Sequence, residues 1–177
     1  MKVEISAISG VRTFYSSFED DERGSVSKII NIDQIETGKN FFAQLLYAKN
    51  SKMGTIRGMH FQVGENAESK YIWCSEGSFF DVLIDVRPGS STFGSWSSIV
   101  LSSKNRRVLY LPPGIAHGYQ TLEDDSSACY LIDKPYDPLN SIVLFFDDPS
   151  IEISWPLPVV SVSDKDKKGL KWPLKFL

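Results

Sequence analysis

The chain has 177 residues, of which 42% are hydrophobic and 23% are charged, and it contains two cysteines and two histidines. This length predicts one domain, residues 1–177, with a core large enough to fold without disulfides or a structural metal. The net charge of −3, with Lys and Arg scattered along the chain, excludes a nucleic-acid-binding surface. Without a signal-peptide pattern or an apolar stretch of membrane-spanning length, we expect a cytoplasmic protein with no nucleic-acid or membrane partner.

Short runs of β-branched and aromatic residues, separated by turn signals, predict a chain built almost entirely of strands. In chain order the predicted strands are Val11–Tyr15, Phe41–Ala48, Thr55–Phe61, Lys70–Ser75, Ser78–Val86, Ser95–Leu101, Arg107–Leu111, Gly118–Leu122, Ser127–Ile132 and Ile142–Phe146. Helical patterns are limited to Ile29–Gly38 and Asp164–Leu170. The fold class is therefore all-β, and the regular strand spacing favours a sandwich or a jelly-roll barrel.

The C-terminal third changes character at Asp147 and becomes rich in proline. This composition predicts an extended arm packed over the barrel rather than further barrel strands. Arms and edge strands of this kind commonly complete a dimer, so we expect a homodimer. Cys74 and Cys129 each lie in an apolar, strand-like run, which predicts free thiols in a reducing compartment.

His60 lies in the segment Arg57–Gln62, on a predicted strand. Side chains alternate along a strand, which places His60 and Gln62 on one face and Arg57 on the other. Taken alone, a histidine in such a strand is more often a hydrogen-bonded core residue than a catalyst. His117, after Pro112-Pro113-Gly114, is as compatible with ligand binding as with a structural hydrogen bond.

A metal site is not expected in this chain. Metal-binding β-barrels need several nitrogen ligands and a carboxylate, but the residue two after His60 is Gln62, and His117 is the only other histidine. Without a metal, a histidine can act as a general base, because its pKa lies near neutral pH. It then needs a carboxylate to orient its ring and a cation to stabilise the charge that develops on the substrate.

The residues alone do not choose these partners. The candidate carboxylates are Asp81, Asp85, Asp147, Asp148, Asp164 and Asp166, and the candidate cations are Lys70, Arg57 and Arg23. A lysine at a strand start usually keeps its ammonium group in water, and Tyr130 could be an acid or a satisfied buried phenol. The residues alone therefore do not determine which reaction the site would catalyse.

The segment Arg57–Gln62 resembles the dTDP-4-dehydrorhamnose 3,5-epimerase family, and the resemblance continues from Gly54 to Asp166. The further segments that carry it are Phe80–Ser90, Thr92–Gly94, Leu111–Tyr119, Asp147–Pro149, Trp155-Pro156 and Ser163–Asp166. The order and spacing of so many segments are far more specific than any one motif.

The resemblance implies a cupin-type jelly-roll that dimerises and uses no metal or other cofactor. It implies an isomerase that inverts C3, C5 or both in a nucleoside-diphosphate 4-keto-6-deoxyhexose through an enolate. The implied catalytic residues are the base His60, its carboxylate partner Asp166, Lys70 at the carbonyl oxygen, and the acid Tyr130 on the opposite face. The implied substrate-binding residues are Arg23, Arg57 and His117 at the diphosphate, together with Gln62 and Tyr136.

The chain departs from the family pattern where the nucleotide would bind. The Arg-Gly-x-Phe-x-Glu motif ends in Lys28 instead of a glutamate, and the Gln-x-Asn motif falls on Leu45–Tyr47, or one residue earlier on Gln44. These changes leave the base of the nucleotide open. The alternatives are a single-carbon epimerase or ketoisomerase acting on a non-dTDP sugar nucleotide, a non-catalytic sugar-nucleotide-binding cupin and, least favoured, a metal-dependent cupin enzyme.

Overall fold

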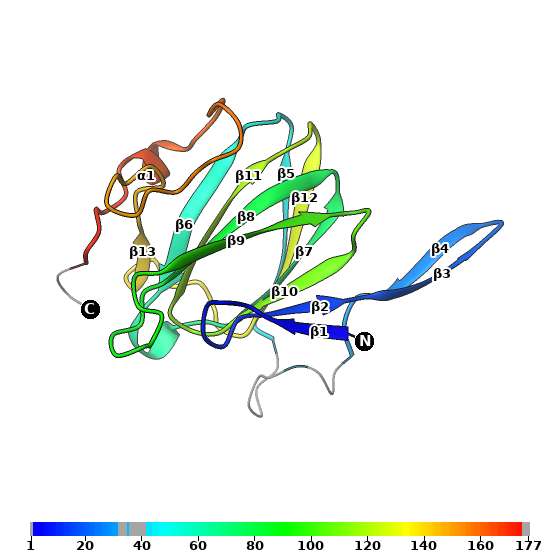
Figure 1. Ribbon diagram of the computed structural model, residues 1–177, viewed down its shortest axis with the longest axis horizontal. Coiled ribbons are helices and arrows are strands. Elements are labelled where there is room, and N and C mark those ends of the chain that lie inside the picture. Colours follow the sequence, from blue (N-terminus) through cyan, green and yellow to red (C-terminus); the bar gives the residue numbers. More distant parts are fainter. Residues whose placement is uncertain (1, 32–34, 36–41, 175–177) are drawn as a thin grey trace.

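A computed structural model describes residues 2–31, 35 and 42–174 and shows two antiparallel sheets that face each other as a jelly-roll barrel (Figure 1). The six-stranded sheet has the order β1 (Lys2–Ile5), β2 (Arg12–Tyr15), β10 (Arg107–Leu111), β7 (Lys70–Glu76), β12 (Ser126–Ile132) and β5 (Gln44–Asn50). The five-stranded sheet has the order β13 (Ser141–Val143), β6 (Ile56–Gln62), β11 (Ile115–Thr121), β8 (Ser78–Asp85) and β9 (Trp96–Ser102).

The remaining elements lie outside the barrel. Strands β3 (Ser17–Asp21) and β4 (Gly24–Lys28) form a hairpin that projects away from it (Figure 1). The 3₁₀ turn η2 (Gly64–Asn66) and the single-turn helix α1 (Asp164–Lys167) are the helical elements of the described residues. None of the described helices is both long and apolar enough to cross a membrane.

The predicted all-β class is confirmed, and every predicted strand overlaps an observed one. β11 begins at Ile115, earlier than predicted, so that His117 lies inside a strand and not in the preceding turn. The predicted helix at Asp164–Leu170 is confirmed as α1, which is shorter. The helix predicted over Ile29–Gly38 is absent at residues 29–31 and 35, and the rest of it lies outside the described residues.

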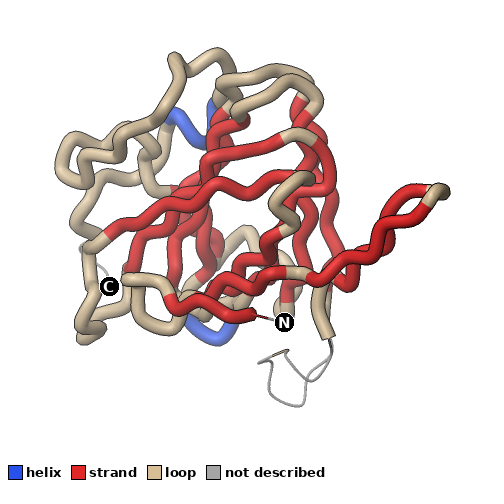
Figure 2. The backbone as a smooth tube through the Cα atoms, turned by 45° about the vertical axis from the view of Figure 1, so that its right-hand side comes forward, coloured by secondary structure: helices blue, strands red, loops and turns tan. Residues whose placement is uncertain are grey.

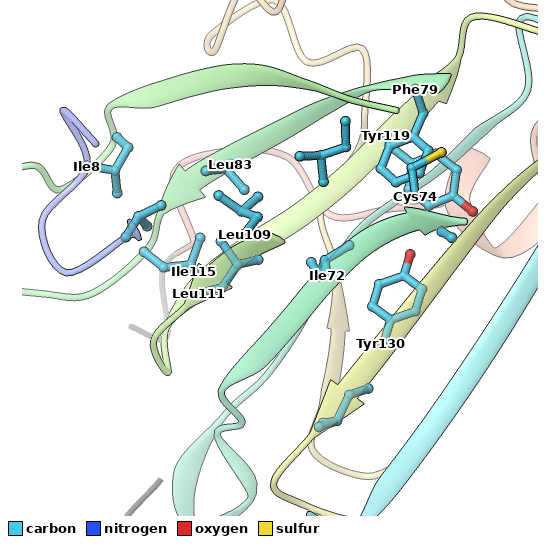
Figure 3. Packing of buried hydrophobic residues seen from close by; sticks show 14 residues of the cluster. Ile8, Ile72, Cys74, Phe79, Leu83, Leu109, Leu111, Ile115, Tyr119 and Tyr130 are labelled. Atoms are coloured by element: carbon cyan, nitrogen blue, oxygen red, sulfur yellow. The ribbon is translucent and has the colours of Figure 1, made fainter. Parts of the chain in front are cut away.

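The main hydrophobic core fills the space between the two sheets (Figure 3). Inward-facing residues of both sheets, such as Ile72 and Leu83, are almost fully buried there. Each such side chain stabilises the fold by roughly 1.5–3 kcal/mol. Tyr119, Tyr130 and Ile132 belong to this core and also line the large cavity described below, so the core holds one wall of the cavity in place.

The predicted C-terminal arm is confirmed, and it covers the outer face of the five-stranded sheet (Figure 2). Trp155 packs edge-on against Phe80, with 6.3 Å between ring centroids, and its indole N–H donates to the carbonyl oxygen of Phe146. Further along, Asp148 accepts the backbone N–H of Trp172 at 2.7 Å. These contacts fix the arm against the barrel and place α1 beside β6.

The pairing of β6 with β11 contains an irregularity that shapes the site. His60 lies opposite His117 and Arg57 opposite Tyr119, so β6 holds one extra residue between the two pairs. Gly58, with φ +113°, lies in this bulge. Because alternation does not hold across a bulge, Arg57 and His60 line the same cavity, and the prediction that they face opposite sides is wrong.

We expect Gly58→Ala to destabilise the protein far more than Gly89→Ala. Both glycines have positive φ, which costs an alanine about 1–2 kcal/mol. A Cβ on Gly89 would meet no neighbour within 4 Å, whereas one on Gly58 would lie 2.6 Å from the Cα of Gly118 and from the carbonyl oxygen of His117. The difference between the variants should therefore reach about 2 kcal/mol or more in urea unfolding. Equal losses would show that the close approach of β6 and β11 is not required.

Candidate active site

A cavity of about 520 Å³ opens between the two sheets and falls within the size range of small-molecule sites. Most residues singled out from the sequence converge on it. The lining includes His60, Lys70, Tyr130, Arg57, His117, Gln62 and Tyr136. His60 comes from β6 of the five-stranded sheet, and Tyr130 and Lys70 come from β12 and β7 of the six-stranded sheet, so these groups occupy opposite walls.

His60 is paired with Asp166, which α1 brings to the back of the histidine ring. The ring Nε2 lies 2.7 Å from Asp166 Oδ1, and the backbone N–H of Gly58 donates to Oδ2 at 3.1 Å. Burial of Asp166 opposes its ionisation, but the hydrogen bonds from His60 and Gly58 outweigh this and lower its pKa below the usual value. The carboxylate can therefore orient the ring and stabilise its protonated form.

Lys70 forms a buried ion pair at the cavity wall. Its Nζ lies 2.8 Å from Oε1 of Glu68, and the two side chains are only 11% and 5% exposed. Lys70 pairs in register with Ile132 of β12, and Tyr130, two residues before Ile132, is the neighbouring inward-facing residue of that strand. The ammonium group is thus held on the same wall as the Tyr130 phenol.

Tyr130 is a buried phenol at the edge of the core, next to Ile72 and Tyr119 (Figure 3). Burial raises the pKa of Tyr130 well above 10, and its hydrogen bond with Tyr119 acts in the same direction. The phenol therefore keeps its proton at neutral pH. This is the property required of a group that donates a proton rather than accepts one.

A second histidine–carboxylate pair lies deeper in the cavity. His117 Nε2 is 2.8 Å from Asp81 Oδ2, and both residues are almost fully buried. Burial raises the pKa of Asp81, although the neighbouring His117 and Lys70 favour its charged form. This pairing commits one ring nitrogen of His117 to Asp81. Within the described residues, no group of three His, Cys, Asp or Glu side chains converges as metal ligands would.

Arg57 and Tyr136 lie at the mouth of the cavity. The Arg57 Nε donates to Oδ1 of Asn50 at 2.7 Å, and the buried Asn50 amide also donates to the Tyr119 hydroxyl. Tyr136 lies beside Lys165 of α1, with 3.3 Å between the Tyr136 hydroxyl and the Lys165 Nζ. Hydrogen bonds from Lys165 and Ser141 lower the pKa of Tyr136. Two cationic side chains thus flank the entrance.

Gln62 lines the cavity, but its amide is used by the protein itself. Its Nε2 donates to the carbonyl oxygens of Asn66 and Pro135, and its Oε1 accepts the backbone N–H of Asp137. These bonds hold the segment that carries Tyr136. A direct contact between Gln62 and substrate stays a prediction, whereas its positioning of Tyr136 is visible in the structure.

Arg23 lies apart from the other predicted site residues. It sits at the turn of the β3–β4 hairpin, with its side chain 88% exposed and paired with Asp21, and it does not line the cavity of its own chain. Lys28 ends the same hairpin, and Tyr47 also lies outside the cavity lining. Of the two alternatives for the Gln-x-Asn motif, the structure supports the one that begins at Gln44, because Gln44 and Leu46 line the cavity.

Three polar residues of the site were missed in the sequence. Glu68 lies in an irregular loop, Asn50 ends a strand, and Lys165 is one of several lysines near the C-terminus. None has a periodic pattern around it that would predict its direction. Lys165 could have been noticed from its position directly before Asp166, since neighbours on one helical turn share a site.

Comparison with known proteins agrees with this geometry. The sequence profile of the dTDP-4-dehydrorhamnose 3,5-epimerase family matches residues 6–173. A dTDP-4-dehydrorhamnose 3,5-epimerase of Shigella flexneri is 35% identical over 175 residues, which cover 97% of this chain and 96% of the relative. One of Mycobacterium tuberculosis is 40% identical over 119 residues, or 66% of this chain, and that alignment spans only 59% of the relative's length.

A solved structure extends the likeness to three dimensions. The dTDP-6-deoxy-D-glucose-3,5-epimerase of Legionella pneumophila, in complex with dTDP-4-keto-L-rhamnose, superposes with a TM-score of 0.88 at 29% identity. The superposition covers 95% of this chain and 90% of that one.

We expect Asp166→Asn to remove a part of the stability that depends on pH. Because the pKa of Asp166 is lowered in the folded state, its contribution is present above the ordinary aspartate value and is lost as the pH falls below about 4. The variant should therefore be less stable than the wild type at pH 7 in urea unfolding, and the gap should narrow at pH 3. Asp164→Asn, on the exposed side of the same helix, is the control and should change little at either pH. A gap that stays constant with pH would contradict a native carboxylate at position 166.

Proposed function

Because the chain belongs to the dTDP-4-dehydrorhamnose 3,5-epimerase family, we propose that it inverts C3, C5 or both in a nucleoside-diphosphate 4-keto-6-deoxyhexose. The observation that carries the proposal is the placement of a histidine base and a protonated tyrosine on opposite walls of one cavity, with an ammonium group beside them. Inversion of a carbon needs these three elements together.

In this proposal His60 removes the proton from the carbon next to the ketone. Asp166 binds Nε2 of the ring, which leaves Nδ1 as the nitrogen that accepts the proton, and it stabilises the imidazolium that forms. The His60 side chain is 40% exposed, so the ring is accessible from the cavity.

Lys70 supports the charge that the proton leaves behind. As the C–H bond breaks, its electron pair moves into an enolate whose oxygen was the C4 carbonyl. A donor aimed at this oxygen is typically worth about 3–4 kcal/mol of barrier. The proposed route therefore needs no metal or other cofactor, because the Lys70 ammonium supplies the positive charge.

Tyr130 completes the inversion by donating its proton to the opposite face of the same carbon. The raised pKa of Tyr130 ensures that this proton is present at neutral pH. After one inversion His60 holds the substrate's proton and Tyr130 is a phenolate, so atoms and charge balance. A ketoisomerase would return the proton to a neighbouring atom and has no use for an acid across the cavity, which favours the epimerase.

The mouth of the cavity suits the nucleotide part of the substrate. Arg57 and Lys165 supply positive charge for the diphosphate, and Tyr136 supplies an aromatic surface beside them. The Legionella relative is bound to dTDP-4-keto-L-rhamnose, which makes a dTDP-linked 4-keto sugar the first substrate to test.

We further propose that the protein is a homodimer in which the β3–β4 hairpin serves the partner. The hairpin projects from the barrel and exposes Phe18 and Val26, which are 52% and 75% accessible. Exposed apolar side chains on a protruding ribbon are costly unless another surface covers them. A partner that covers the hairpin would bring Arg23 into a site that its own chain cannot reach. Each chain would contribute one domain, residues 1–177.

We expect His60→Asn and Tyr130→Phe to separate the two proton transfers. With a dTDP-linked 4-keto-6-deoxyhexose in deuterated water, His60→Asn should slow exchange at C3 and C5 by about 10²-fold or more. Tyr130→Phe should still allow exchange on the His60 side but should form almost no epimer. Mass spectrometry and proton NMR measure both, and Tyr47→Phe, whose ring lies outside the cavity, is the control. A wild-type protein that exchanges neither carbon would end the proposal.

We expect Arg23→Gln and His60→Asn to complement each other when the two variants are combined in one dimer. If Arg23 serves the partner's cavity, each heterodimer contains one intact site, and random mixing should restore about a quarter of the wild-type sites. Co-expression with two affinity tags gives the mixed dimers, and epimerisation at low substrate concentration is measured. Failure of purified heterodimers to regain activity would contradict the shared site.

A further inference from the structure

Glu68 is a buried carboxylate at the cavity that has no part in the reaction as described. Its Oε1 lies 2.8 Å from Lys70 Nζ, and its side chain is 5% exposed. Among the described residues, its second oxygen, Oε2, is buried without a hydrogen-bond partner. Buried carboxylates are normally satisfied at both oxygens, so this arrangement needs an explanation.

The loop around Glu68 does not need this side chain for its own structure. The neighbouring Ser69 is fixed by Asp133, which accepts the Ser69 backbone N–H at 2.8 Å and its hydroxyl at 2.7 Å. On the other side, Asn66 is fixed by Asp137. The hydrogen bonds that shape the loop are therefore made by its neighbours, and Glu68 interacts with Lys70 instead.

Lys70, by contrast, needs a partner. An ammonium group that is only 11% exposed loses most of its hydration, and an anion in direct contact offsets the cost of that loss. A neutral amine would stabilise an enolate oxygen far less than an ammonium group. The charge of Lys70 is therefore a condition of the proposed reaction.

The other charged or titratable groups on the elements around Lys70 do not replace Glu68. They include Asp81 on β8, Asp133 directly after β12, His117 and Tyr119 on β11, Tyr130 on β12, and Arg57 and His60 on β6. Of the two carboxylates, Asp81 is paired with His117 at 2.8 Å and Asp133 is bonded to Ser69. Glu68 is thus the carboxylate in direct contact with the ammonium group.

We propose that Glu68 is the positioning residue of Lys70: it holds the ammonium group at the cavity wall where the enolate oxygen forms, and its charge offsets the desolvation of that group. The inference rests on the proposed epimerase function. Glu68 does not touch the reacting atoms and acts only through Lys70. One Glu68 oxygen contacts the ammonium group, so the other ammonium hydrogens of Lys70 remain available to the substrate.

The test is the pH profile of solvent deuterium exchange for the wild-type protein and the Glu68→Gln variant. The glutamine keeps the shape and one acceptor but removes the negative charge, so Lys70 should lose its proton at lower pH. Near pH 7 we expect the exchange rate of this variant to lie within about threefold of the wild-type rate. On the alkaline side its exchange rate should begin to fall at a lower pH than that of the wild type, so that it is about tenfold slower there. Glu65→Gln, exposed in the same loop, is the control and should follow the wild type.

Two further variants keep the result interpretable. Glu68→Asp keeps the negative charge, so its exchange rate should decline on the alkaline side at the same pH as in the wild type, even if the rate itself is lower. This variant replaces Glu68→Gln in the test if the glutamine variant does not fold. In a Lys70→Gln background, adding Glu68→Gln should change exchange by no more than about twofold, because a residue that acts through Lys70 has nothing left to act on.

The outcomes separate the two ideas. A wild-type protein without exchange overturns the proposed function and this inference with it. A wild-type protein that exchanges, with a Glu68→Gln profile that superposes on it, overturns the inference alone. So does an equal loss from Glu68→Gln in the presence and absence of Lys70.

Discussion

One carboxylate links the parts of this protein that have to meet for the site to exist. Asp166 lies 106 residues after His60, on a helix of a single turn, yet its two oxygens bind the His60 ring and the backbone N–H of Gly58. The first bond orients the base, and the second fixes the bulge that turns Arg57 toward the same cavity. The C-terminal arm, packed on the barrel through Trp155 and its neighbours, is what keeps Asp166 there.

The cavity shows how several charges can be buried in a small space. Its buried or half-buried cationic and basic groups are matched one to one: His60 with Asp166, His117 with Asp81 and Lys70 with Glu68. Pairing of this kind offsets the large cost of desolvation. At the mouth the balance differs, because Arg57 donates to the neutral oxygens of Asn50 and Lys49 and Lys165 lies beside a phenol. Each basic group of the interior therefore has a carboxylate partner, whereas the two cations at the entrance form no ion pair with a carboxylate among the described residues, as suits an anionic nucleotide end.

The parts of this structure that follow from short-range rules were predictable from the sequence. Period-2 alternation and turn residues gave the strands, and the Pro-rich composition gave the arm. Asp166 could not be chosen among six aspartates until the resemblance selected it, because no local pattern connects it with His60. Arg57 was placed on the wrong face because a one-residue bulge leaves no mark in the alternation except a glycine. Strands β1, β3 and β4 were missed because they contain no buried residue, and burial is what makes a strand visible in a sequence.

The two proton-transfer groups differ in their access to water, and this shapes the return of the site to its starting state. In the proposed reaction His60 must lose a proton after each inversion and Tyr130 must regain one. His60 is 40% exposed and can release its proton to solvent directly. Tyr130 is only 8% exposed, but its hydrogen bond with Tyr119 continues through Asn50 to Arg57 at the mouth. Since neither the Asn50 amide nor the Arg57 guanidinium gives up a proton at neutral pH, this chain of hydrogen bonds holds the phenol in place, and Tyr130 must regain its proton from water that enters the open cavity.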